Sequence, residues 1–226
     1  MRLVLLGPPG SGKGTQATRL AATYGIHHFS TGQAFRYEMD RETELGKIAK
    51  SYIDKGNYVP DEFVTRFVDS ILSKPKYEKG FLLDGYPRSV PQAEDLDGLL
   101  ATRGDRLDAV VSITLTPEET LARLAERLLC EKCGAVYNLR LAPPRQAGRC
   151  DRCGEALQSR SDDAPEAVRR RLEVDARARE ALLGFYRSES RRAKNGTGRL
   201  LEIDGTGSID EVFGRIQAGL SACRSN

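Results

Sequence analysis

The most constraining feature of this chain is a glycine-rich segment near its start, GPPGSGKGT at residues 7–15. A short apolar run precedes it at residues 3–6, and a run typical of a helix follows it at residues 16–24. A strand, a glycine-rich turn and a helix together form a phosphate site, because successive backbone N–H groups and the helix N-terminus point at the anion. The side chain of Lys13 adds a full positive charge. The segment therefore predicts a nucleotide phosphate site.

Short apolar runs alternate with longer helical stretches along most of the chain. The predicted strands are residues 3–6, 80–83, 109–115 and 200–203. The predicted helices are residues 16–24, 32–41, 44–55, 61–73, 90–103, 117–129, 164–193 and 209–220. This alternation is typical of an α/β fold in which helices cover both faces of a parallel sheet. Ligands of such folds bind at the carboxyl ends of the strands.

Two regions interrupt the alternation of strands and helices. Residues 30–59 contain predicted helices but no strand, and we interpret them as a small helical insertion. Residues 126–163 are rich in Gly, Pro and Cys and contain short β-like pieces such as residues 135–139. The second region is too small to bury much apolar surface by itself.

Length and composition limit the class of protein. The chain has 226 residues and a formal net charge of +3, which suits one α/β domain with insertions. The positive excess is too small to indicate nucleic-acid binding. The longest apolar runs have the length of strands, so we expect no membrane span. The first predicted strand begins almost at Met1, so we also expect no signal peptide, and a cytoplasmic enzyme is the expectation.

Four cysteines form a metal-binding pattern within the second region. Two C-x-x-C pairs, Cys130 with Cys133 and Cys150 with Cys153, have identical spacing and flank a short basic hairpin. Each turn can present two thiolates to one tetrahedral ion, so the pattern predicts a zinc site. Four cysteines close the coordination shell, which favours a structural metal that stabilises a small subdomain.

Other interpretations of the cysteine segment remain open. The thiols could bind no metal, or the tetrathiolate could take iron. The arginines of the hairpin, Arg140, Arg145, Arg149 and Arg152, would suit a nucleic-acid-binding zinc ribbon, but we favour the simpler explanation of a solvated hairpin surface. Cys223 lies outside the pattern.

Arginines recur at the edges of the predicted elements, at Arg36, Arg88, Arg123, Arg127, Arg160 and Arg171. Arg123 and Arg127 are four residues apart, which would place them on one face of the predicted helix over 117–129. Any one of these side chains could be a surface arginine. Together with a phosphate loop they predict a ring of guanidinium groups around a polyphosphate.

In these features the chain resembles the adenylate kinases. The shared motifs span nearly the whole chain in order: GPPGSGKGTQA, STG at 30–32, VPDE at 59–62, GFLLDGYPRS at 80–89, the arginines 123 and 127, SRSDD at 159–163 and IDGT at 203–206. The resemblance implies a P-loop NTPase-type parallel sheet flanked by helices, with a helical NMP-binding insertion and a zinc-bearing lid. The implied core domain comprises residues 1–29, 60–125 and 164–226, with the insertion at 30–59 and the lid at 126–163.

The resemblance also implies a reaction and its site residues. Adenylate kinases transfer the γ-phosphoryl group of ATP to AMP reversibly and with Mg²⁺, giving two ADP, and so serve nucleotide homeostasis and salvage. The residues implied for ATP are Gly10, Ser11, Gly12, Lys13, Gly14, Thr15, Arg123, Arg127, Val136, Tyr137 and Gly207. Those implied for AMP are Thr31, Arg36, Asn57, Tyr58, Val59, Gly85, Tyr86, Pro87, Arg88, Gln92, Arg160 and Arg171. Those expected to act on the transferring group are Lys13, Arg88, Arg123, Arg127, Arg160 and Arg171.

The chain departs from the family pattern at a few positions. Gln33 stands where the family usually has Asp, an acid that with Asp84 would hold the water shell of Mg²⁺. We therefore expect Asp84 to be the main anionic support of the ion, and a higher Mg²⁺ requirement. Ser161 replaces a common lysine, and Asn138 stands where histidine is frequent, which affects contacts of the lid.

Two other functions compete with this interpretation. UMP/CMP kinases share the chemistry but typically lack Thr31 and the long lid. A regulatory or nucleic-acid-binding protein could use ATP and a zinc ribbon, but no aromatic residues interleave with a dense basic stripe. We expect ATP, AMP and ADP as partners, no nucleic acid or membrane, and a monomer.

Overall fold

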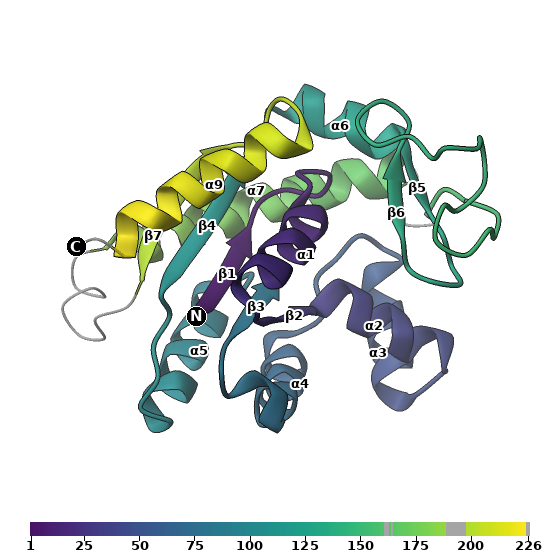
Figure 1. The fold of residues 1–226 in the computed structure, drawn as a ribbon. Coiled ribbons are helices and arrows are strands. Elements are labelled where there is room, and N and C mark those ends of the chain that lie inside the picture. The colour runs from purple at the N-terminus through teal and green to yellow at the C-terminus, as the bar shows by residue number, and fades with distance from the viewer. Residues whose placement is uncertain (161–162, 164, 189–197, 225–226) are drawn as a thin grey trace.

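The core of the fold is a parallel sheet. In the computed structural model, which describes residues 1–160, 163, 165–188 and 198–224, this sheet has five strands in the order β2-β3-β1-β4-β7 (Figure 1). The strands are β1 (Arg2–Leu6), β2 (His27–Ser30), β3 (Phe81–Asp84), β4 (Ala109–Thr114) and β7 (Arg199–Asp204). The predicted α/β fold class is confirmed.

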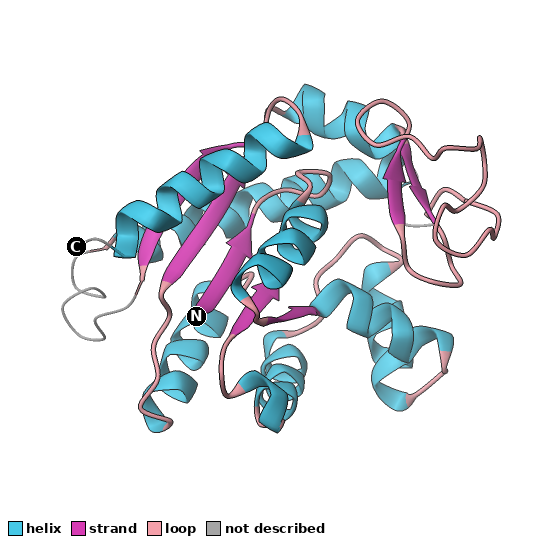
Figure 2. Ribbon diagram, in the orientation of Figure 1, coloured by secondary structure: helices cyan, strands magenta, loops and turns pink. Residues whose placement is uncertain are grey.

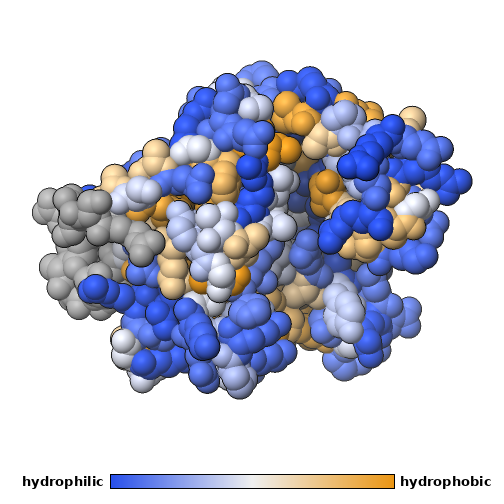
Figure 3. Space-filling view, viewed as in Figure 1, coloured by the Kyte–Doolittle hydropathy of each residue, from blue (hydrophilic) through white to orange (hydrophobic). Residues whose placement is uncertain are grey.

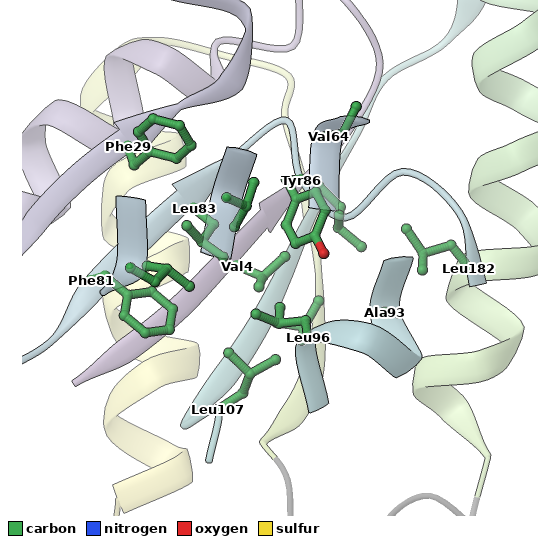
Figure 4. Packing of buried hydrophobic residues seen from close by; sticks show 14 of the residues in the cluster. Val4, Phe29, Val64, Phe81, Leu83, Tyr86, Ala93, Leu96, Leu107 and Leu182 are labelled. Atoms are coloured by element: carbon green, nitrogen blue, oxygen red, sulfur yellow. The ribbon is translucent and has the colours of Figure 1, made fainter. Parts of the chain in front are cut away.

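Helices cover both faces of the sheet (Figure 2). One face carries α1 (Lys13–Tyr24) and α9 (Ile209–Arg224), and the other carries α4 (Asp61–Leu72), α5 (Val90–Thr102) and α7 (Pro165–Arg187). Because side chains alternate along a strand, Leu3 and Leu5 of β1 pack with α1 and α9. Val4 packs into the opposite cluster (Figure 4). All three are fully buried, as expected for a parallel sheet covered on both sides.

The sequence prediction missed the strand β2. It lies at the edge of the sheet and is hydrogen-bonded to β3. Buried and exposed side chains do not alternate clearly along this strand, and Phe29 is the one buried residue among its four. An edge strand that buries so little apolar surface shows no apolar run in the sequence.

The predicted helix over residues 117–129 is wrong at its C-terminal end. α6 (Pro117–Ala125) stops short, and β5 (Arg127–Leu129) pairs antiparallel with β6 (Val136–Asn138). Leu129 also exchanges backbone hydrogen bonds with Gln158. These pairings between distant segments override local helix propensity. Arg123 on α6 and Arg127 on β5 therefore do not share a helix face.

The other predicted elements exist, with bounds shifted by a few residues. α1 begins at Lys13, so the lysine of the phosphate loop is already helical. The predicted helix over 164–193 corresponds to α7, and its predicted end falls in residues 189–197, outside the described residues. A short 3-10 helix, η1 (Pro75–Tyr77), precedes β3. No helix in the described part of the chain has both the length and the apolar character needed to cross a membrane.

Two excursions extend from the sheet near the carboxyl ends of its strands (Figure 1). The first holds α2 (Thr31–Asp40) and α3 (Glu44–Ile53), and the second holds β5, β6 and the cysteine loops. Gly46 lets α3 pack on α2, because a side chain there would collide with the backbone of Glu38. Thr43 caps α3 by accepting a hydrogen bond from Gly46 N at 3.0 Å.

Candidate active site

The glycine-rich segment forms the turn between β1 and α1, as predicted (Figure 1). Gly10 and Gly12 have φ angles of 79° and 84°, a left-handed backbone that glycine adopts without strain. Gly7 lies close to β4, since a Cβ there would come within 2.6 Å of Ile113 O. Gly12 is also the N-cap of α1, so the first amides of the helix adjoin the loop. This is the geometry of an anion-binding loop.

The side chain of Lys13 lies across this loop. Its Nζ donates hydrogen bonds to Gly7 O at 2.6 Å and to Pro8 O at 2.8 Å. Burial lowers the pKa of Lys13 to about 8, and the negative charge of Asp84 offsets that effect only in part. An anion bound in the loop would stabilise the same buried charge. The protonation of Lys13 is therefore coupled to anion binding.

Asp84 ends β3 at the carboxyl edge of the sheet. Its side chain is largely buried, and its Oδ2 lies 3.5 Å from Nε2 of His28 on β2. Burial raises the pKa of the carboxyl group, but the adjacent His28 and the charge of Lys13 outweigh burial, so the pKa lies below its usual value. Asp84 is thus ionised at neutral pH. Gln33 is exposed and lines the same cleft.

A cleft of about 1340 Å³ separates the core from the two excursions. Figure 3 shows the surface hollowed between the core and the cysteine-bearing segment. The volume exceeds the ~300–1000 Å³ of a typical site for one small molecule, so more than one nucleotide fits. Every residue implied for ATP lines this cleft: Gly10, Ser11, Gly12, Lys13, Gly14, Thr15, Arg123, Arg127, Val136, Tyr137 and Gly207.

A smaller recess of about 80 Å³ adjoins the cleft and shares lining residues with it. The residues implied for AMP that line the recess are Thr31, Arg36, Asn57, Tyr58, Val59, Gly85, Arg88, Gln92, Arg160 and Arg171. Pro87 lines the larger cleft. The ring of Tyr86 instead lies in the core (Figure 4), 1% exposed. Its hydroxyl donates to Gln92 O at 3.1 Å. Tyr86 therefore supports the recess from the core side.

Arg123 is fixed from two directions. Its side chain is 7% exposed, its Nε donates to Glu119 Oε1 at 2.8 Å, and its Nη2 donates to Gly205 O at 2.9 Å. The backbone O of Arg123 accepts from Nδ2 of Asn138 at 3.1 Å. Asn138 thus joins the cysteine-bearing segment to α6 at the point where the chain leaves the core.

A single carboxylate holds two further arginines of the cleft. Arg127 donates from Nε and Nη2 to both carboxylate oxygens of Asp163, whose side chain is 5% exposed. Arg171 Nη1 lies 3.5 Å from Oδ1 of the same carboxylate. A bidentate pair fixes the plane of the guanidinium group as well as its position. Asp163 therefore orients cations contributed by β5 and α7.

Tyr58 connects the helical excursion to α7. The guanidinium carbon of Arg88 lies 4.7 Å from the centre of the Tyr58 ring, a cation–π contact. The Tyr58 hydroxyl donates to Asp175 Oδ1 at 3.0 Å, and Asp175 Oδ2 lies 3.2 Å from Nη1 of Arg179. Burial raises the pKa of Tyr58 to about 12, so the hydroxyl keeps its proton at neutral pH.

A second contact joins the helical excursion to α7. Arg170 Nε on α7 donates to Asn57 Oδ1 at 3.1 Å.

The four cysteines of the second excursion converge, as predicted. Their sulfur atoms all lie within 4.8 Å of one another, with 3.4 Å between Cys130 and Cys153 and 3.5 Å between Cys133 and Cys150. None forms a disulfide. A tetrahedral zinc ion with Zn–S bonds of ~2.3 Å requires S–S separations of about 3.8 Å, so these residues fit the ion. Cys223 lies on α9, outside this group.

Several residues that shape the site did not emerge from the sequence. His28 belongs to the missed strand β2, and Asp175 lies four residues after Arg171 on the same face of α7. Recognition of β2 and of helical spacing along α7 would have identified them. The predicted lid position Ser161 lies outside the described residues.

Comparisons with known proteins agree with this geometry. Residues 5–191 match the adenylate kinase family. The adenylate kinase of Caldanaerobacter subterraneus subsp. tengcongensis is 48% identical over 97% of this chain and 96% of the relative. That of Carboxydothermus hydrogenoformans is 47% identical over 97% of this chain and 99% of the relative, and that of Archaeoglobus fulgidus is 44% identical over the full length of both chains. The loop, the arginines, the cysteine group and these similarities lead to one conclusion: the chain belongs to the adenylate kinase family, whose members are nucleoside monophosphate kinases.

Proposed function

We propose that the cleft catalyses the reversible, Mg²⁺-dependent transfer of the γ-phosphoryl group of ATP to AMP, giving two ADP. The observation that carries the proposal is the meeting of an anion-binding loop with arginines from several separate elements around a cleft of about 1340 Å³. Family membership gives the reaction, and the cleft gives space for both nucleotides at once.

On the donor side, the loop amides and Lys13 would bind the ATP phosphates, with Arg123 and Arg127 against them. The guanidinium groups are already oriented by Glu119 and Asp163, so little side-chain entropy is lost when phosphate binds. Val136, Tyr137 and Gly207 line the part of the cleft proposed for the ATP base.

On the acceptor side, Arg36 and Arg88 would bind the AMP phosphate, with Thr31 and Gln92 at the base. The phosphate of AMP is already an anionic nucleophile, so the reaction needs no general base. Arg160 and Arg171 line both the cleft and the recess, which suits a role on the transferring group between them. Catalysis then consists of positioning and of charge neutralisation.

The donor set of the cleft fits a hydrated Mg²⁺ ion. Asp84 is buried, ionised and placed beside the phosphate loop, and Mg²⁺ usually keeps several waters while one or two carboxylates hold them. When bound, Mg²⁺ neutralises charge on the transferring phosphates. Gln33 lines the same cleft and adds no negative charge there.

Residues 30–59 and 126–163 act, in this proposal, as an NMP-binding insertion and a lid that exclude water, the competing acceptor. The cysteine group would hold structural zinc and stabilise a lid whose own apolar cluster is small. We further place the enzyme in the cytoplasm as a monomer that binds neither nucleic acid nor membrane.

The acceptor is the first test of this proposal. ATP and Mg²⁺ are incubated with AMP, GMP, UMP, CMP or no acceptor, and formation of ADP is measured. We expect rapid transfer to AMP, because Thr31 and Gln92 line the acceptor recess. Preferential transfer to UMP or CMP would overturn the assignment of these residues, and no transfer to any acceptor would overturn the proposed activity.

The variant Gln33→Asp tests magnesium use. A second carboxylate near Asp84 should lower the Mg²⁺ concentration for half-maximal rate by about five-fold, since a water-separated charge pair contributes on the order of 1 kcal/mol. Gln33→Asn, which changes side-chain length without adding charge, is the control and should leave the requirement unchanged. An unaltered Mg²⁺ dependence in Gln33→Asp would contradict the hypothesis.

Removal of the cysteine ligands tests the structural metal. Replacing Cys130 and Cys133 with Ser should abolish bound zinc and lower Tm by ~10 °C, because a lost metal costs several kcal/mol in a domain of this size. Metal content, thermal unfolding and activity at low temperature are measured, with Cys223→Ser as the control. A stably folded, inactive double variant would show that the metal is not purely structural.

Proton uptake tests the electrostatics of the phosphate loop. With a pKa of about 8, Lys13 is mostly neutral at about pH 9 before ATP binds, and the triphosphate restores its charge. Titration calorimetry in buffers of different ionisation enthalpy should show uptake approaching about one proton at that pH and little at about pH 7. Lys13→Arg, which is always charged, should take up none. The same uptake in both proteins would exclude Lys13 as the source.

A further inference from the structure

The side-chain amide of Gln92 is held by two partners of opposite polarity. Nε2 of Gln92 donates to Asp61 Oδ1 at 2.7 Å, and Oε1 accepts from the backbone N of Arg88 at 2.8 Å. An ionised carboxylate only accepts hydrogen bonds, and a backbone N–H only donates. A rotation of the amide by 180° would therefore place donor against donor and acceptor against acceptor. Gln92 is 3% exposed, so water cannot easily relieve such a mismatch.

Asp61, in turn, is fixed by its surroundings. It is the first residue of α4, and its Oδ2 accepts from Ser89 Oγ at 2.6 Å. Ser89 is the N-cap of α5 and accepts from the backbone N of Gln92 at 3.3 Å. Asp61, Ser89 and Gln92 thus form a closed network between the N-termini of α4 and α5. Both carboxylate oxygens of Asp61 are in use.

The amide of Gln92 keeps capacity for a ligand. Its Nε2 has a second N–H, and its Oε1 has a second lone pair. Gln92 lines the recess proposed for the acceptor base. A 6-aminopurine presents an amino donor beside an unprotonated ring nitrogen, while a 6-oxopurine presents a carbonyl acceptor beside a ring N–H. An amide pairs with both edges only if it can rotate by 180°.

We propose that Asp61 is a specificity-determining positioning residue of the acceptor site. By fixing the orientation of the Gln92 amide, Asp61 makes the site select a 6-aminopurine monophosphate over a 6-oxopurine monophosphate. Asp61 acts through Gln92 and not by touching the base. The inference rests on the proposed contact between Gln92 and the acceptor base.

The variant Asp61→Asn tests the inference, with AMP and IMP as the two acceptors. IMP differs from AMP at the edge in question, where a carbonyl and a ring N–H replace the amino group and the bare nitrogen. An asparagine amide can turn to accept from or donate to Gln92, so only the backbone N–H of Arg88 then favours one orientation of the Gln92 amide. The AMP/IMP ratio of kcat/KM should fall by about five-fold, at the lower end of the range for loss of one bidentate base contact. The ratio of dissociation constants for the two monophosphates should fall in parallel.

Glu62→Gln is the matched control. Glu62 is the next residue of the same first turn of α4, it is exposed, and the substitution makes the same change of charge. Its AMP/IMP ratio should equal that of the parent protein. If Asp61→Asn raises KM for both monophosphates equally, or changes neither, Asp61 has no role in selection and the inference is overturned.

A double-variant cycle separates this inference from the proposed role of Gln92. If Gln92→Leu leaves the AMP/IMP ratio unchanged, Gln92 does not read the base, and both the contact and the inference fail. If Gln92→Leu lowers the ratio, Asp61→Asn in that background should lower it no further, because Asp61 acts through the missing amide. An additional, independent fall would contradict the inference while leaving the contact of Gln92 with the base intact.

Discussion

Positive charge crowded at one edge of a parallel sheet is the constraint on which this structure depends. Lys13, Arg123, Arg127 and Arg171 all line one cleft. Like charges so close in a partly buried site repel one another, and desolvation adds to their cost. The structure offsets this with carboxylates on the surrounding elements, at Asp84, Glu119, Asp163 and Asp175. The same carboxylates orient the cationic side chains. These contacts therefore both stabilise the protein in the absence of nucleotide and preorganise the cations for binding phosphate.

Polar contacts near the cleft join both excursions to the core, and the helical excursion also shares the main apolar cluster of the core through Phe35. Tyr58 donates to Asp175 on α7, and Asn138 donates to the backbone of Arg123 on α6. Single hydrogen bonds of this kind contribute on the order of 1 kcal/mol each, far less than the apolar clusters of the core. The cysteine-bearing segment packs an apolar cluster of its own, so its polar attachment to the core can loosen while the sheet stays intact, as the proposed role of a lid requires.

The sequence predicted structure best where residues close together in the chain determine the local geometry. The phosphate loop, the strands buried on both faces and the C-x-x-C pairs each predict their own geometry from residue type and spacing. It failed where distant segments decide the outcome. The end of α6 depends on the pairing of β5 with β6 and on Gln158, and β2 exists because β3 offers an edge. Likewise the partner of Gln92 is Asp61, 31 residues away, and no periodicity in the sequence links the two.

The proposed donor and acceptor sides of the cleft differ in how their polar groups are held. Lys13 donates to backbone carbonyls that it can exchange for an anion, and its pKa of about 8 lets its charge follow the ligand. Gln92 lies between a carboxylate, which accepts its hydrogen bond, and a backbone N–H, which donates to it. The first arrangement adapts to a phosphate chain of variable charge. The second suits the fixed pattern of donors and acceptors on the acceptor base that Gln92 is proposed to contact. A kinase that binds two nucleotides with the same phosphate chemistry can therefore discriminate between acceptors at the nucleobase, where hydrogen bonds orient the protein amide, while phosphate recognition stays permissive.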